Sequence, residues 1–126
     1  MLGLLLAASL QLIPNQAYVN YTPPSVKAKI DVQAIVQSLT AYANNNGGSY
    51  PDSLVPLVMP DTNGHAYLEG YNGKIPKDPW KREYLYDPPT PEHPRPRVRS
   101  LGSDGKPGGS GTAEDIDSEE LRESDR

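Results

Sequence analysis

Apolar residues recur at helical spacing in the first half of the chain. Successive members lie four, three, four and three positions apart, and the set is Ala28, Val32, Ile35, Leu39 and Tyr42. This spacing places all five on one face of a helix covering about residues 26–44. The intervening polar positions predict an outward-facing back made of Lys27, Lys29, Asp31, Gln33 and Gln37. Ser25 is a suitable N-cap, and the Asn-Asn-Asn-Gly-Gly segment at residues 44–48 has the composition that ends helices.

The rest of the chain alternates between turn residues and two short strand candidates. Residues 52–58 favour a short helical turn, and the following segment up to Trp80 is dense in Pro and Asn-Gly. Residues 83–86 and 97–101 contain Tyr and Val side chains that suit a half-buried strand. The segment between them has five prolines, which cannot donate to a strand ladder. We therefore expect an antiparallel pair joined by a rigid loop, with the last ten residues frayed or weakly helical.

The chain begins with an apolar run of about a dozen residues, MLGLLLAASLQLIP. Crossing a bilayer takes about 20 apolar residues, and the run lacks the basic residues that open a secretory signal peptide. Residues 1–24 are therefore interpreted as a weak signal or as the remaining end of a longer apolar helix. We expect the globular domain at residues 25–117 and an acidic C-terminal tail at residues 118–126.

Composition narrows the classes of function. A chain of 126 residues with no Phe and one Trp has room for one domain with a small core. The absence of Cys excludes disulfides and thiolate metal sites, so a bound metal ion is the usual alternative for stabilising so small a domain. From Asp104 to the end, eight acidic residues against three basic ones give a charge of −5. This acidic end argues against nucleic acid as a partner and is compatible with a hard cation such as calcium.

The Gly-rich segment from Leu101 to Asp115 has the composition of a cation-binding loop. Calcium prefers six to eight oxygen ligands, and a sharply folded chain supplies them from carboxylates and backbone carbonyls. Asp104 and Asp115 lie eleven positions apart, as do the first and last ligands of an EF-hand loop. Lys106 and Gly108 occupy positions that should be ligands, so the segment is not an EF-hand. A Gly-rich turn with solvated acids remains the alternative interpretation.

Three segments, in this order, resemble the major pseudopilin of bacterial type II secretion systems. The helix end and the Tyr-Pro pair at residues 41–54, AYANNNGGSYPDSL, come first. The Lys-Asp-Pro-Trp segment at residues 77–80, followed by Tyr84, is similar to the family's "DPWG…Y". The segment at residues 100–116, SLGSDGKPGGSGTAEDI, is similar to the family's calcium loop. Residues 2–15 also resemble the end of the family's apolar N-terminal helix, although its leader and glutamate are absent and Pro23-Pro24 departs from a continuous helix.

The resemblance implies an α+β, pilin-like fold, in which one long N-terminal amphipathic helix packs on a small antiparallel sheet beside a C-terminal calcium-binding loop. It implies calcium ligands at Asp104 and Asp115 by side chain, Leu101 by its backbone carbonyl, and Glu114, with Ala113 standing where some members have Asp. It also implies a non-enzymatic subunit that polymerises with itself and assembles with other pseudopilins and inner-membrane secretion components. The subunit would be anchored in the inner membrane, with its globular domain in the periplasm, and the missing start of the helix suggests a truncated or misassigned N-terminus.

Functions other than that of a major pseudopilin are also compatible with parts of the sequence. A minor pseudopilin, a type IV pilin-like subunit and a free-standing secreted calcium-binding domain are alternatives. An enzyme would need Asp104 and Asp115 as an acid/base pair, but the sequence offers no convincing nucleophile and base set. His65 and His93 lie in separate Pro/Gly-rich loops, which argues against a zinc pair. Trp80 and the tyrosines at positions 67, 71, 84 and 86 are expected to be core and rim residues.

Overall fold

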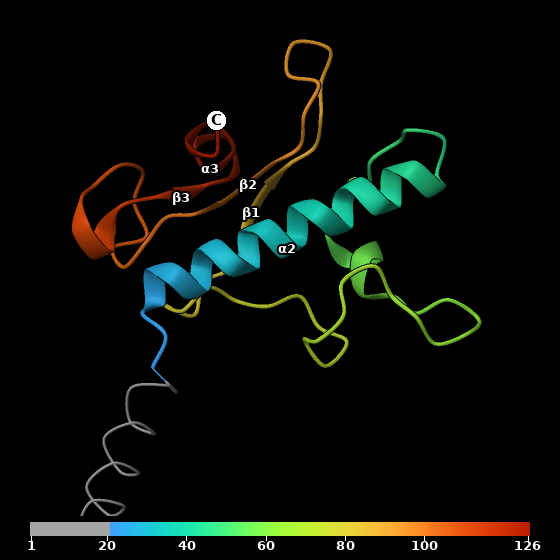
Figure 1. Cartoon of the computed structure of the whole chain (residues 1–126), viewed down its shortest axis with the longest axis horizontal. Helices are drawn as coiled ribbons and strands as arrows, with labels where there is room; N and C mark the ends of the chain where they lie inside the picture. The colour runs from blue at the N-terminus through green and yellow to red at the C-terminus, as the bar shows by residue number, and fades with distance from the viewer. Residues whose placement is uncertain (1–20) are drawn as a thin grey trace, which may run out of the picture.

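The longest element among the residues that the structure describes is helix α2 (Pro24–Asn45), which spans the domain in the computed structural model (Figure 1). The structure describes residues 21–126, so most of the predicted apolar segment 1–24 lies outside the described residues. The predicted helix is confirmed, but its N-cap is Pro23 and not Ser25, which lies in the first turn. Proline fits the first helical position, because its missing amide hydrogen would have no helical partner there. Within the described part of the chain, no helix has the length and apolarity needed to cross a membrane.

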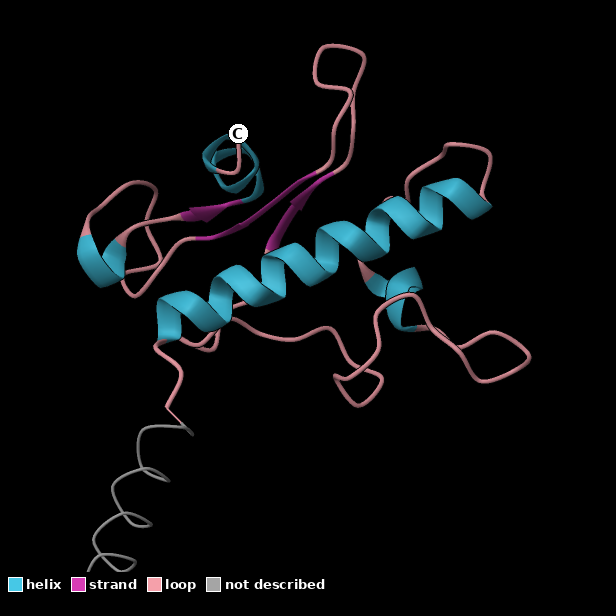
Figure 2. Cartoon of the chain, in the orientation of Figure 1, coloured by secondary structure: helices cyan, strands magenta, loops and turns pink. Residues whose placement is uncertain are grey.

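Three short strands form an antiparallel sheet beside α2, in the order β1-β2-β3 (Figure 2). The strands are β1 (Leu85–Asp87), β2 (Arg97–Ser100) and β3 (Ile116–Asp117). The predicted antiparallel pair is confirmed, with β1 starting two residues later than expected. Strand β3 was not predicted from the sequence, because two residues are too few to display an alternating pattern. The proline-rich loop and the Gly-rich loop leave the sheet at opposite ends (Figure 1).

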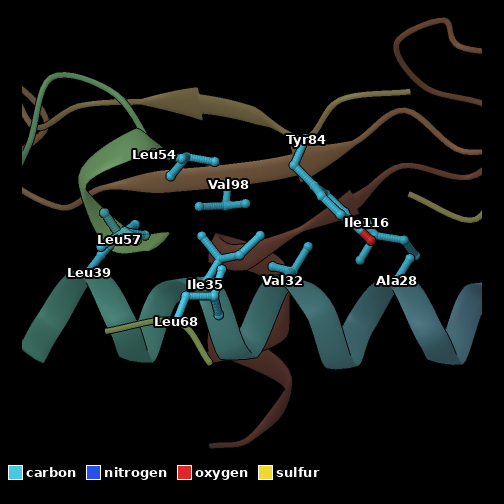
Figure 3. Packing of buried hydrophobic residues seen from close by; sticks show 10 residues of the cluster. All are labelled: Ala28, Val32, Ile35, Leu39, Leu54, Leu57, Leu68, Tyr84, Val98 and Ile116. Carbon is cyan, nitrogen blue, oxygen red and sulfur yellow. The ribbon is translucent and has the colours of Figure 1, made fainter. Parts of the chain in front are cut away.

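The apolar face of α2 packs on the sheet, as predicted, and also on the 3₁₀ turn η1 (Val55–Val58) (Figure 3). Burial of these side chains is the main favourable contribution to the free energy of folding of so small a domain. The core residues come from the helix, from the loop that follows it, and from the strands. They are Ala28, Val32, Ile35, Leu39, Leu54, Leu57, Leu68, Tyr84, Val98 and Ile116. Trp80 and the tyrosines at 67, 71 and 86 are partly buried against this cluster, which agrees with their expected structural role.

A short helix, α3 (Ser118–Ser124), follows β3 directly and packs against α2 through the partly buried Leu121. Its N-cap is Asp117, whose carboxylate accepts a hydrogen bond from the amide of Glu119 at 3.0 Å and pairs with Arg97. Burial alone would raise the pKa of the Asp117 carboxyl, but these hydrogen bonds and the Arg97 charge lower it below its ordinary value. The first part of the predicted acidic tail is therefore a capped helix on the domain surface.

Asp31 contradicts the prediction that it belongs to the outward polar back of the helix, since it is fully buried. Tyr71 donates to its Oδ1 and Tyr84 donates to its Oδ2, each at 2.8 Å, and Lys27 forms an ion pair with it. The helical period explains the error, because position 31 lies one turn after Ala28 and on the same face. A buried carboxylate needs such partners, so this network fixes how the helix meets the loop and the sheet.

Replacing Tyr84 with Phe removes the hydroxyl that donates to Asp31. The carboxylate oxygen then stays buried without this donor, so we expect the free energy of unfolding to fall by about 1–3 kcal/mol. Urea unfolding at pH 7 measures the change. Tyr21→Phe, at an exposed position, is the control and should alter stability by less than about 0.5 kcal/mol. Equal stability of the Tyr84→Phe variant and the wild type would show that the carboxylate does not depend on this hydroxyl.

The pKa of Tyr71 is raised to about 12 by partial burial, by its hydrogen bond to Asp31 and by the Asp31 charge. A raised pKa means that its contribution to stability is complete below the ordinary tyrosine pKa of about 10 and is lost as the pH rises through about 12. The stability difference between the wild type and Tyr71→Phe should therefore be constant below about pH 9 and shrink above pH 10. Denaturant midpoints measured across this range test the prediction, and a constant difference would contradict it.

A candidate cation-binding loop

The Gly-rich segment at residues 101–115 connects β2 to β3 and folds back on itself. The amide of Ser103 donates to the carbonyl of Thr112 at 2.9 Å, and the hydroxyls of the same two residues are 3.3 Å apart. A 3₁₀ turn, η2 (Gly111–Ala113), forms part of the returning limb. The two limbs of the loop are therefore held together by the backbone, and the loop has a defined conformation.

Glycines sit where the two limbs come closest. A Cβ atom on Gly102 would lie 2.7 Å from the carbonyl oxygen of Glu114, and one on Gly109 would lie 2.6 Å from that of Ala113. Both glycines have positive φ, which other residues rarely adopt. Only glycine fits at these two crossings. The first crossing brings Gly102, the residue after the predicted ligand Leu101, against the backbone of the predicted ligand Glu114.

The acidic residues of the loop differ in their surroundings. Asp115 accepts a hydrogen bond from the amide of Gly108 at 3.0 Å through Oδ2, while its Oδ1 is buried with no hydrogen-bond partner. Asp104 is exposed and accepts from the amide of Lys106 at 3.0 Å, which closes a local turn. The Glu114 side chain is exposed. Leu101 and Asp115 therefore follow and precede the paired residues Ser100 and Ile116 at the base of the loop, whereas Asp104 is exposed farther along it.

These residues fit calcium only if backbone oxygens take part. The described residues contain no group of three or more His, Cys, Asp or Glu side chains that could hold a metal ion. Calcium nevertheless accepts backbone carbonyls as ligands, and a loop folded back on itself offers several. The buried Oδ1 of Asp115 is an acceptor without a hydrogen-bond partner, and either a donor group or a cation would satisfy it. The donor set therefore suits a hard cation bound partly by carboxylate and partly by backbone.

A second network, which sequence analysis did not assign, connects this loop to the turn at residues 78–82. The carboxylate of the buried Asp78 accepts from the amides of Trp80 at 3.0 Å and Arg82 at 2.8 Å through Oδ1. Its Oδ2 accepts from the hydroxyl of Ser100, at the end of β2, at 2.8 Å. The signal in the sequence was an Asp directly before Pro, a residue type that bonds to the backbone two positions on.

Arg82 reaches from this turn into the Gly-rich loop. Its Nη1 donates to the carbonyl oxygens of Gly102 at 3.0 Å and Ser103 at 3.4 Å. A Cβ atom on Gly105 would lie 2.5 Å from Arg82 Nε, so the guanidinium lies against the backbone of the loop. Nothing in the sequence pattern marked Arg82, because its partners are backbone oxygens twenty positions away.

Comparison with known proteins agrees with the fold and with the ordered motifs. The profile of the family described as "Type II secretion system (T2SS), protein G" matches residues 21–119. The chain is 38% identical over 96 residues to a type II secretion system core protein G of Vibrio cholerae, a match covering 71% of this chain and 64% of that protein. It is 36% identical over 110 residues to one of Pseudomonas aeruginosa, covering 82% and 72% respectively. The chain therefore belongs to the type II secretion system protein G family, the major pseudopilins.

Proposed function

We propose that this chain is a structural subunit of a type II secretion pseudopilus, which polymerises to help export folded proteins across the outer membrane. The family match, which covers almost all the described residues, carries this proposal. The structure adds a long helix whose predicted apolar face packs inside the domain. Assembly therefore needs another apolar surface, and the N-terminal apolar segment preceding α2 is the candidate.

The proposed partners follow from the same role. The subunit polymerises with further copies of itself and assembles with other pseudopilins and inner-membrane secretion components. The apolar segment, as part of a longer helix, anchors it in the inner membrane, and the globular domain lies in the periplasm. The exposed residues Val26 and Ile30, one turn apart near the start of α2, extend this apolar character onto the domain.

We further propose that the Gly-rich loop binds one structural calcium ion. The side chain of Asp115 and the backbone at Leu101 would contribute at the base of the loop, with Asp104 and Glu114 as the remaining acidic residues. The buried Oδ1 of Asp115 supports this most directly. The ion would supply no chemistry beyond charge and coordination, which hold the two limbs together.

Calcium should stabilise the domain, because an ion that binds only the folded state lowers its free energy. At ten times its Kd the ion contributes about 1.4 kcal/mol, which raises the Tm by roughly 5–10 °C. Asp104→Ala and Asp115→Ala should each abolish this shift, whereas Asp125→Ala, in the exposed C-terminal residues, should leave it intact. Differential scanning calorimetry with calcium and with chelator provides the measurement. An identical calcium response in all three variants would mean that the acidic end acts only as diffuse charge.

Fibre formation should require the apolar helix ahead of the domain. Residues 25–126 contain every core residue of the part of the chain that the structure describes, so we expect this fragment to be a folded monomer without hydrolase activity. A protein with a continuous apolar helix joined before residue 25 should instead form fibres, since lateral packing of helices needs continuous hydrophobic surface. Light scattering and negative-stain microscopy compare the two proteins. Fibres of the isolated domain would refute this account of assembly.

A further inference from the structure

We propose that Arg82 is a cationic side chain bound to the start of the Gly-rich loop, where it opposes calcium binding next to Leu101 and keeps the loop folded when calcium is scarce. The calcium half of this inference rests on the proposed calcium site. The contact that carries it is the donation from Arg82 Nη1 to the carbonyl oxygens of Gly102 and Ser103. These two residues directly follow Leu101, the predicted backbone ligand.

The guanidinium has the chemistry for this role. It is positively charged at all relevant pH values and donates several hydrogen bonds in a fixed plane, so one side chain can bind two successive carbonyls. Calcium binds the same kind of oxygen. A backbone carbonyl directed at the guanidinium is less available to a metal ion, and the two positive charges also repel each other. Binding of one cation should therefore weaken binding of the other.

Hydrogen bonds of the Arg82 backbone fix the position of this residue. The amide of Arg82 donates to the carboxylate of Asp78, and the amide of Asp78 donates to the carbonyl of Arg82, each at 2.8 Å. The Asp78 carboxylate also binds the hydroxyl of Ser100, which accepts from the amide of Gly102 at 3.3 Å. One buried carboxylate thus fixes both the base of the arginine and the start of the loop.

The shape of the loop also accommodates the arginine. Gly105 has positive φ, and a Cβ atom there would meet the Nε and Cζ atoms of Arg82 at 2.5 and 2.6 Å. The guanidinium therefore occupies the space that a side chain at position 105 would take. Lys106 carries a charge in the same loop, and no hydrogen bond from its Nζ to the loop backbone is present among the described residues. The two residues provide a matched pair for separating a specific contact from a general charge effect.

The test compares Arg82→Met with Lys106→Met in the full chain, because each removes one positive charge and keeps a side chain of similar length. In chelator, Arg82→Met should lower the Tm by roughly 4–8 °C and speed cleavage within the loop by a protease, because two carbonyls lose their donor. Calcium affinity measured by titration calorimetry should rise at least threefold in Arg82→Met. Lys106→Met should change each quantity much less, and Arg82→Lys should lie between Arg82→Met and the wild type.

Different results overturn different claims. If Arg82→Met and the wild type have equal calcium affinity, the competition is refuted even where the Tm falls. If the Tm and the cleavage rate in chelator are unchanged, Arg82 does not hold the loop. If both variants raise the affinity equally, the effect is general charge and the proposed role of Arg82 is wrong. If no protein in the series binds calcium, the calcium site itself fails, and the measurements in chelator still decide whether Arg82 holds the loop.

Discussion

A buried carboxylate determines how the long helix of this domain is positioned against the sheet and the loops. Asp31 sits in the apolar face of α2, where an unpaired charge would be strongly unfavourable. Two tyrosine hydroxyls, from the loop at Tyr71 and from Tyr84 beside β1, satisfy its two oxygens, and Lys27 balances its charge. Apolar contacts alone would tolerate some sliding of the helix over so small a sheet. The hydrogen bonds of Asp31 require one register, since each oxygen has a donor from a different segment.

The sequence predicted those elements of the fold whose residues follow a recognisable pattern of spacing or residue type. Five apolar positions at helical spacing located α2, and β-branched and aromatic residues located the first two strands. Asp31 was misassigned because a polar residue was taken as evidence for an outer face, although its position one turn after Ala28 placed it inside. β3 has only two residues and exists because β2 offers it a partner, so no local pattern could reveal it.

The candidate site was predictable in composition but not in arrangement. Glycines and acids predicted a loop that could surround a cation, and Leu101 and Asp115 lie at the two ends of this loop, next to the paired residues Ser100 and Ile116. A glycine is indispensable only where the two limbs of the loop cross. The positions of these crossings are a property of the folded loop and cannot be read from the sequence. The roles of Asp78 and Arg82 depend on partners about twenty positions away, so they become visible only when the turn and the loop are placed side by side.

The two long loops of the sheet leave it at opposite ends, with β2 between them (Figure 1). The loop before β2 contains five prolines, and the loop after β2 is closed by its own backbone hydrogen bonds. Each loop is therefore ordered by means that do not involve the other. Insertions, deletions and substitutions can accumulate in one loop while the other and the helix interface keep their structure. Evolution can in this way diversify the outer surface of such a subunit without redesigning the scaffold that carries it.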